Sequence, residues 1–178
     1  MSVPRKLTIY ERNQLLKYSL KESDLLTKGN LPVEYLTGFV NFGGFEVVVD
    51  ENVLIPRVET EELVGHVLDF MQTLAKPLRY LEVGTGSGAI SLAVFAFLQK
   101  KSQLKLEKFV LSEVSPKALE LAQKNFRSFL SPTALSEVDF VLSDLLTEIK
   151  AQAFELIVAN LPYIPTGAME SLDSSVKD

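Results

Sequence analysis

The stretch Leu81-Glu82-Val83-Gly84-Thr85-Gly86-Ser87-Gly88-Ala89-Ile90 decides the fold, and it holds three of the nine glycines in this chain of 178 residues. Residues 80–83 predict a short strand. Residues 89–99 are apolar nearly all round, which is typical of a helix buried against a sheet. Glycines allow a sharp turn and a close approach of a ligand to the backbone. The stretch therefore predicts a strand, a ligand-contacting loop and a helix; the alternative is a tight turn that binds nothing.

The same alternation of strand and helix continues along the chain. Strands are predicted at residues 108–111, 138–142 and 154–159. A helix is predicted from Ser115-Pro116, an N-cap followed by proline in the first turn, to about Phe129. Strands that alternate with helices indicate a parallel sheet with right-handed crossovers and helices on both faces. The fold class is therefore α/β and Rossmann-like, preceded by a short helix and a β-hairpin.

The region before this alternation has a different composition. Residues 1–28 carry six basic and three acidic side chains, whereas the remaining 150 carry twelve and twenty. One short amphipathic helix is predicted over residues 9–20, and residues 39–42 and 45–49 flank Gly43-Gly44 as a hairpin. A further helix is predicted from Thr60. We therefore expect a helical appendage at residues 1–30, a hairpin linker at 31–58 and a cofactor-binding domain at 59–178.

Composition excludes several kinds of site. The chain has no cysteine, so disulfides, thiolate metal centres and cysteine nucleophiles are ruled out. His66 is the single histidine, and the formal net charge is −5, which disfavours a broad nucleic-acid-binding face. No apolar run approaches the roughly 18 residues needed to cross a bilayer. We expect a cytoplasmic protein without a membrane partner and with no metal site.

Distinctive residues follow each predicted strand, where open parallel sheets bind ligands. Glu113 comes after the second strand and can accept hydrogen bonds from ribose hydroxyls. Asp144 and Leu145 come after the third strand, where Asp144 can accept from an adenine amino group or cap the following turn. Together with Gly84-Thr85-Gly86-Ser87-Gly88, these residues predict an adenosine-containing cofactor, either NAD or S-adenosylmethionine.

The tetrapeptide Asn160-Leu161-Pro162-Tyr163 follows the fourth strand and discriminates between these cofactors. The Asn160 oxygen and the Leu161 carbonyl can accept the two hydrogens of a planar –NH₂ group, which can stack on the Tyr163 ring. Pro162 stiffens the loop. Hydride transfer needs no such grip, whereas methyl transfer to an amide or amino nitrogen does. The sequence therefore predicts S-adenosylmethionine as cofactor and S-adenosylhomocysteine as product.

From Leu31 onward the chain resembles the HemK-type release-factor glutamine methyltransferases. The resemblance rests on six motifs in order: Glu34-Tyr35-Leu36-Thr37-Gly38, the Phe42 hairpin, Leu54-Ile55-Pro56-Arg57-Val58-Glu59-Thr60-Glu61, the glycine-rich stretch, Ser115-Pro116-Lys117-Ala118-Leu119 and Asn160-Leu161-Pro162-Tyr163-Ile164-Pro165. It implies a class I methyltransferase sheet of order 3-2-1-4-5-7-6, of which strands 1–4 are visible. It also implies methylation of N5 of the glutamine in the Gly-Gly-Gln loop of class 1 peptide-chain release factors.

The chain departs from the family pattern at several positions. Leu161 stands where the family usually has proline, and Glu82 and Glu113 stand where it usually has aspartate. The N-terminal domain is shorter than usual, and the chain ends at Asp178 with four strands visible. We therefore expect an incomplete domain with weak activity, in which the fourth strand is an edge that can pair with further residues or with a second chain.

The sequence is also compatible with two other functions. The tetrapeptide chemistry also suits a nucleic-acid amino methyltransferase acting on adenine N6 or guanine N2. A truncated, non-catalytic methyltransferase-like binding protein is the second alternative. Arg57 is expected either at the mouth of the active site, where it would contact substrate, or in a structural ion pair with Glu59.

Overall fold

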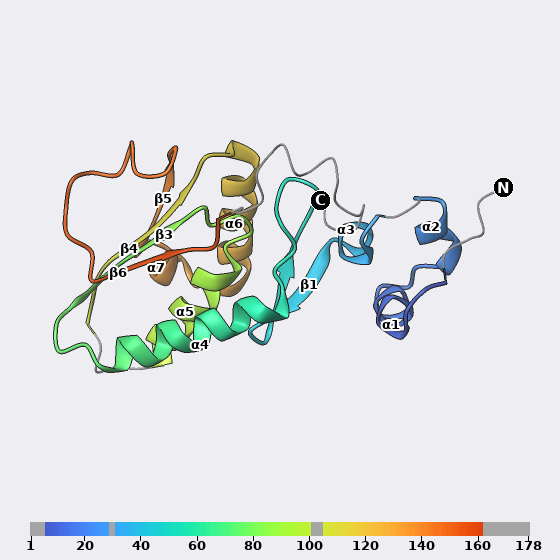
Figure 1. Ribbon diagram of the computed structural model, residues 1–178, viewed down its shortest axis with the longest axis horizontal. Helices are drawn as coiled ribbons and strands as arrows, with labels where there is room; N and C mark the ends of the chain where they lie inside the picture. The colour runs from blue at the N-terminus through green and yellow to red at the C-terminus, as the bar shows by residue number, and fades with distance from the viewer. Residues whose placement is uncertain (1–5, 29–30, 101–104, 162–178) are drawn as a thin grey trace.

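The computed structural model describes residues 6–28, 31–100 and 105–161 (Figure 1). Within them the chain forms seven helices and six strands, in two sheets. In chain order these are α1 (Ile9–Lys17), α2 (Glu22–Leu26), α3 (Val33–Thr37), β1 (Phe39–Phe42), β2 (Phe45–Val48), α4 (Val58–Gln72), β3 (Leu78–Val83), α5 (Ala89–Lys100), β4 (Leu106–Glu113), α6 (Pro116–Phe129), α7 (Pro132–Leu135), β5 (Val138–Leu142) and β6 (Leu156–Ala159).

The larger sheet is parallel throughout, with strand order β5-β4-β3-β6. This confirms the predicted order 3-2-1-4 of the first four strands. Arg79 fixes the start of the β3–β6 pair, because its guanidinium donates to both carboxylate oxygens of Glu155 at 2.7 and 3.1 Å. The carboxyl ends of β3, β4, β5 and β6 therefore meet at one edge, where a ligand is expected.

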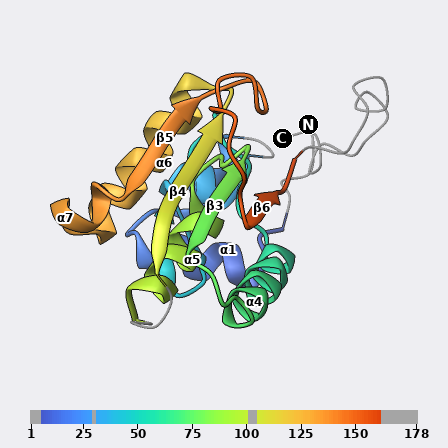
Figure 2. The ribbon, with the colours of Figure 1, turned by 90° about the vertical axis from the view of Figure 1, so that its left-hand side faces the viewer.

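Helices α4, α5 and α6 all pack on one face of this sheet, and Figure 2 shows the strands in front of α5 and α6. Alternate residues of β3 and β4, such as Tyr80 and Phe109, point into this face, and their rings stack at 4.3 Å between centroids. The prediction of helices on both faces is therefore wrong for the described part of the chain. Strand–helix alternation requires crossovers, but it does not specify the face on which each helix packs.

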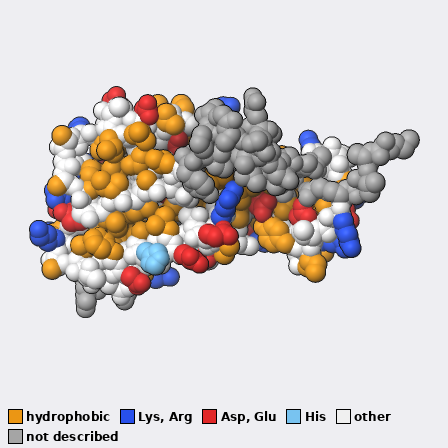
Figure 3. Space-filling view, viewed as in Figure 1, with side chains coloured by type: hydrophobic (Ala, Val, Ile, Leu, Met, Phe, Trp, Pro, Cys, Tyr) orange, Lys and Arg blue, Asp and Glu red, His pale blue; other side chains and the backbone are white. Residues whose placement is uncertain are grey.

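The opposite face has a much smaller core. Leu81, Val83 and Val110 are buried there under Val141, Ile149 and Phe154, the last two from the segment between β5 and β6. Other apolar side chains are about half exposed in this region, namely Leu142, Leu145, Leu146 and Ile157. The space-filling view shows hydrophobic side chains gathered on the half of the molecule that carries the sheet (Figure 3).

The hairpin β1–β2 turns at Gly43-Gly44, as predicted, with φ of 56° and 82° at the two glycines. A two-residue hairpin turn of this kind requires positive φ, which glycine adopts without strain. Three helices hold the hairpin. The Gly43 amide donates to Glu61 of α4 at 3.0 Å, a Cβ at Gly43 would lie 3.2 Å from Ala93 of α5, and Val48 bonds to Asn125 of α6. The hairpin therefore belongs to the main core, with Phe42 and Val47 fully buried in it.

The N-terminal region contains two helices where one was predicted over residues 9–20. Helix α1 begins with a capping box of Thr8 and Glu11. It stops at Tyr18 because Ser19 has φ of 57°, a left-handed conformation that no helix continues through. Leu25 of helix α2 packs with Leu7, Leu15 and Val33, so the region has its own small core.

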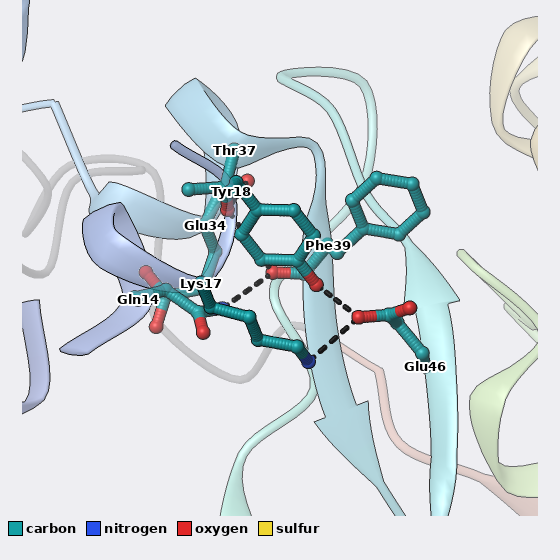
Figure 4. A network of polar contacts seen from close by, with 7 residues as sticks. All are labelled: Gln14, Lys17, Tyr18, Glu34, Thr37, Phe39 and Glu46. Atoms are coloured by element: carbon teal, nitrogen blue, oxygen red, sulfur yellow. Dashed lines mark hydrogen bonds and ion pairs between the residues drawn. The ribbon is translucent and has the colours of Figure 1, made fainter. Parts of the chain in front are cut away.

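Polar contacts join α1 to the hairpin (Figure 4). Gln14 donates to the Phe39 carbonyl at 3.1 Å, and the Tyr18 ring stacks on the Phe39 ring. Lys17 forms an ion pair with Glu46 at 2.7 Å, and the Tyr18 hydroxyl donates to the same carboxylate. The appendage is therefore attached through β1 and β2. None of the helices in the described ranges is long and apolar enough to span a membrane.

Candidate functional site

The loop between β3 and α5 has the left-handed backbone that its glycines predicted. Gly84, Gly86 and Gly88 have φ of 69°, 55° and 79°. Space is limiting at two of them: a Cβ on Gly84 would lie 2.5 Å from Leu161 Cδ2, and one on Gly88 would lie 3.2 Å from Ala122 and Phe126 of α6. Nothing lies within 4 Å of a Cβ position on Gly86. The loop therefore packs at both ends and is open in the middle.

A pocket of about 410 Å³, its open mouth included, lies beside this loop. Several of the predicted site residues line it together, although they come from distant parts of the sequence. They are Arg57 at the start of α4, Gly84, Thr85, Gly86 and Ser87 of the loop, and Asn160 after β6, with Leu54, Pro56, Thr60, Glu82, Ala89 and Ile90 completing the wall. Gly88 packs against α6 instead.

Glu82 lies at the end of β3 under the loop, with 1% of its surface exposed. Its Oε2 accepts a hydrogen bond from Thr85 Oγ1 at 2.7 Å and another from the Ser91 hydroxyl. Both donors are neutral, and no cation pairs with this carboxylate within the described ranges. Burial raises the pKa of Glu82 to about 7. A buried carboxylate on a pocket wall without a cationic partner favours a ligand that carries positive charge.

Glu113 ends β4, as predicted, and its side chain is almost fully buried. Oε1 accepts from the amides of Val114 and Ser115 at 2.9 and 3.0 Å, and Oε2 accepts from the Gly86 amide at 2.9 Å. A carboxylate has about four lone-pair sites, so one remains, on Oε2. The structure therefore joins Glu113 to the glycine loop and leaves one acceptor site for a ligand hydroxyl.

Asp144 and Leu145 follow β5 but do not line the pocket described above. Asp144 is exposed. The turn after it is capped by Ser143, whose Oγ accepts from the Glu148 amide at 3.1 Å, so the capping role considered for Asp144 belongs to its neighbour. Leu145 has φ of 51°, rare for a residue with a Cβ. Its left-handed backbone marks a strained position at the carboxyl edge of the sheet.

Asn160 and Leu161 come directly after β6. Asn160 is exposed to the pocket, and its carboxamide has no hydrogen-bond partner among the residues the structure describes. Leu161 covers Gly84. Pro162 and Tyr163, which the sequence also assigned to this site, lie outside the described residues. Arg57 forms no ion pair within residues 6–28, 31–100 and 105–161, so the pairing with Glu59, one of its two expected roles, is not found there.

Sequence reasoning missed two residues of this region. From the sequence, Glu82 was identified only as a replacement for the family's usual aspartate. Its position directly before the predicted glycine loop could have indicated a site residue. Asn125 of α6 is fully buried and donates to the Ser87 carbonyl of the glycine loop at 2.8 Å. Its partners are 38 and 77 residues away in the sequence, so no local pattern could have identified it.

Comparisons with known proteins indicate the family to which the chain belongs. A family model described as "Methyltransferase small domain" matches residues 63–173. A release factor glutamine methyltransferase of Deinococcus radiodurans is 36% identical over 149 residues, which cover 83% of this chain and 48% of the relative. One of Leptospira interrogans is 37% identical over 168 residues, covering 93% and 56%. The chain thus spans about half the length of these curated relatives.

Solved structures support the fold. The catalytic domain of human Mettl16, solved with an RNA hairpin, superimposes with a TM-score of 0.53 at 19% identity, covering 71% of this chain and 42% of that one. Likeness at this level of identity supports the α/β methyltransferase architecture and carries no information on substrate. The sequence-based assignment of a class I methyltransferase sheet is therefore confirmed.

Proposed function

This chain belongs to the methyltransferase small domain family, and from that membership we propose that it carries the cofactor site of an S-adenosylmethionine-dependent glutamine methyltransferase acting on peptide-chain release factors. The observation that carries the proposal is the placement of Asn160, Arg57 and Glu82 around one pocket beside the glycine loop. The relatives named for release factor glutamine methylation support the choice of substrate.

The residues on the carboxyl edge of β3 and β4 fit an adenosyl cofactor with a cationic amino-acid end. Open space above Gly86 admits a ligand against the backbone. The free acceptor site on Glu113 suits a ribose hydroxyl, and the unpaired carboxylate of Glu82 suits an ammonium group. We assign Asp144 and Leu145 to the adenine end. When bound, S-adenosylmethionine supplies a methyl group on a positively charged sulfur.

The acceptor side is assigned to the tetrapeptide after β6. In this assignment the Asn160 oxygen and the Leu161 carbonyl accept the two N–H bonds of the glutamine amide. The sequence assigns Pro162 and Tyr163, which lie outside the described residues, to the same grip. These contacts aim the nitrogen lone pair at the methyl group for in-line displacement, and they favour the positive charge that develops on nitrogen. The methylated amide then loses its proton to water, so this assignment needs no strong general base.

Positioning carries most of the catalysis in this scheme. An amide nitrogen is a poor nucleophile because its lone pair is delocalised, whereas a sulfonium is an excellent leaving group. Correct orientation of two reactants can contribute up to roughly 7–11 kcal/mol. Arg57, at the mouth of the pocket, is assigned to the substrate, where its guanidinium can donate to peptide carbonyls.

Methyl transfer from labelled S-adenosylmethionine tests the proposal. The chain is incubated with a class 1 release factor, with a variant in which the glutamine of Gly-Gly-Gln is alanine, and with RNA and DNA. We expect label in the release factor and none in the alanine variant. Label in nucleic acid would favour an adenine or guanine amino methyltransferase. Binding of the release factor without transfer would favour a non-catalytic role. Cytoplasmic location and the three-part domain division remain predictions from the sequence.

A further inference from the structure

Asn125 is a fully buried polar residue on the inner side of α6. Its carboxamide makes three hydrogen bonds, all to backbone atoms outside its own helix. Oδ1 accepts from the Val48 amide at 2.8 Å, and Nδ2 donates to the Val48 carbonyl at 3.0 Å and to the Ser87 carbonyl at 2.8 Å. Both donors of the side chain are therefore used, one toward the hairpin and one toward the glycine loop.

The two bonds to Val48 reproduce the paired exchange found between antiparallel strands. Toward β2, the Asn125 side chain thus behaves as a neighbouring strand residue would. The third bond extends from this pair to the segment between β3 and α5. One side chain therefore fixes the hairpin, helix α6 and the glycine loop relative to one another.

The bond to Ser87 lies next to the turn that ends the glycine loop. Because the peptide between Ser87 and Gly88 is a rigid plane, holding the Ser87 carbonyl also orients the Gly88 amide. That amide donates to the Thr85 carbonyl at 2.8 Å and closes the turn. Gly88 has φ of 79°, which glycine adopts as readily as a negative φ, so the backbone alone does not select this conformation and the contacts around it do. Its other neighbours on α6, Ala122 and Phe126, contribute packing alone.

We propose that Asn125 is a positioning residue for cofactor binding: it holds the Ser87–Gly88 peptide so that the glycine loop has its ligand-binding shape before the ligand arrives. This inference rests on the proposed function, because it takes the loop to be the cofactor loop. Asn125 itself contacts no ligand and acts through the Ser87 carbonyl.

Calorimetric titration with S-adenosylhomocysteine tests the inference on matched variants. Asn125→Ala removes all three bonds. Asn125→Asp keeps the acceptor for the Val48 amide but turns an oxygen toward both carbonyls. Leu121→Ala is the control, since it shortens a buried side chain of the same helix that the loop does not bond to. All are compared at a temperature where circular dichroism shows them folded.

We expect the dissociation constant to rise about tenfold or more in both Asn125 variants, as the loss of a buried bond predicts, and to change less than about twofold in Leu121→Ala. The cofactor KM should rise in the same proportion while kcat stays near the parent value. Equal weakening by Leu121→Ala, or unchanged affinity in Asn125→Ala, would overturn the inference.

Amide hydrogen exchange in the ligand-free chain separates this inference from the proposed function. Exchange at Gly88 should accelerate in both Asn125 variants and exchange at Val48 only in Asn125→Ala, and both should stay unchanged in Leu121→Ala. A parent chain that binds no S-adenosylhomocysteine contradicts the proposed function. In that case exchange at Gly88 alone tests whether Asn125 holds the Ser87–Gly88 peptide. Unchanged exchange at Gly88 in Asn125→Ala refutes it.

Discussion

Strands β4 and β6 flank β3 and each contains an apolar run, Phe109 to Leu111 and Leu156 to Ala159, but their surroundings differ. Residues Phe109 to Glu113 of β4 are all buried, with β5 on the far side. In β6 only Val158 is buried, and Ile157 is 54% exposed. Within the described ranges β6 pairs with β3 alone. An apolar strand sequence therefore does not specify whether both neighbours are present, and the expectation that β6 lies at an edge holds for this part of the chain.

The polar residues at the ends of the two strands differ in the same way. Glu113, after β4, is held by three backbone amides, and the loop beside it is held by Asn125. Asn160 follows β6, and Arg57 lines the same pocket. The Asn160 carboxamide and the Arg57 guanidinium have no partner within the described residues. We infer that the proposed cofactor side is held in shape by contacts within the chain, and we propose that Asn160 and Arg57 bind the substrate.

The largest expected effect comes from Asn160→Ala on the acceptor side. Loss of one preorganised hydrogen-bond partner at a reacting centre lowers turnover by roughly 10²–10³-fold. Affinity for S-adenosylhomocysteine should change little. Glu113→Ala is the matched change on the β4 side, and it should mainly weaken cofactor binding. Steady-state kinetics with a release factor and calorimetry measure both. If both variants lose turnover and S-adenosylhomocysteine affinity in the same proportion, the division into a cofactor side and an acceptor side is wrong.

The next prediction concerns two carboxylates with opposite pH dependence. Burial raises the pKa of Glu82 to about 7, and the bonds from Arg79 lower that of Glu155 to about 2, from an ordinary value of 4.5. The folded chain thus holds the Glu82 proton more tightly than the unfolded chain does. The stability this gives is complete below pH 4.5 and is lost as pH rises to about 7, by at most about 3 kcal/mol.

Glu82→Gln should flatten the stability curve in that window, measured by urea unfolding at a series of pH values. Glu155 has the opposite sign: its stabilisation is present above pH 4.5 and is lost as pH falls toward 2. Glu155→Gln is therefore the control that leaves the slope between pH 4.5 and 7 unchanged. A Glu82→Gln chain with the parent slope would show that this carboxyl does not titrate as its burial implies.

Gly84→Ala tests the contact between the two sides, because Leu161 lies against this glycine. Its positive φ predicts a loss of about 1–3 kcal/mol in the free energy of unfolding, and the 2.5 Å approach of Leu161 Cδ2, the end of an exposed side chain, adds a smaller steric part. Adding Leu161→Ala should recover part of the loss, since only the steric part is relieved. Gly65→Ala on α4, where a Cβ meets nothing within 4 Å, should instead stabilise the chain. Additive effects of Gly84→Ala and Leu161→Ala would contradict the contact.

The smallest effect is expected at Leu145, after β5. Asparagine tolerates left-handed backbone better than leucine does, so Leu145→Asn should raise the free energy of unfolding by about 0.5–1 kcal/mol. Leu146→Asn, at a neighbour of similar exposure without positive φ, should give no gain. Chemical denaturation of the two variants checks this. A gain of equal size at both positions would mean that polarity rather than backbone strain is responsible.

Local signals predicted the elements well. Ser115 caps α6 and Pro116 occupies its first turn, as expected, and the Gly43-Gly44 turn has the backbone that its glycines require. The strand order was predicted because it came from a family resemblance carried by many spaced motifs. By contrast, the break at Ser19 was missed because serine is not a residue that usually marks positive φ. The helices α3 and α7 were missed because five and four residues are too few to show a helical repeat of apolar positions.

Long-range contacts account for what could not be predicted at the site. The placement of Arg57 in the pocket depends on the packing of α4 beside α5, and the role of Asn125 depends on two backbone segments far away in the chain. The raised pKa of Glu82 arises from burial that becomes visible only once α5 covers β3. The sequence shows which titratable residues are present, but only the fold shows which of them are buried and therefore have a shifted pKa.

Calorimetric titration of this chain with S-adenosylhomocysteine, with NAD run in parallel, tests the central claim most directly. The claim is that the loop Gly84–Gly88, Glu82 and Glu113 form a site for a methyl-donor cofactor within this chain. We predict saturable binding of S-adenosylhomocysteine and no measurable heat with NAD. Saturable binding of NAD without any response to S-adenosylhomocysteine would contradict the account.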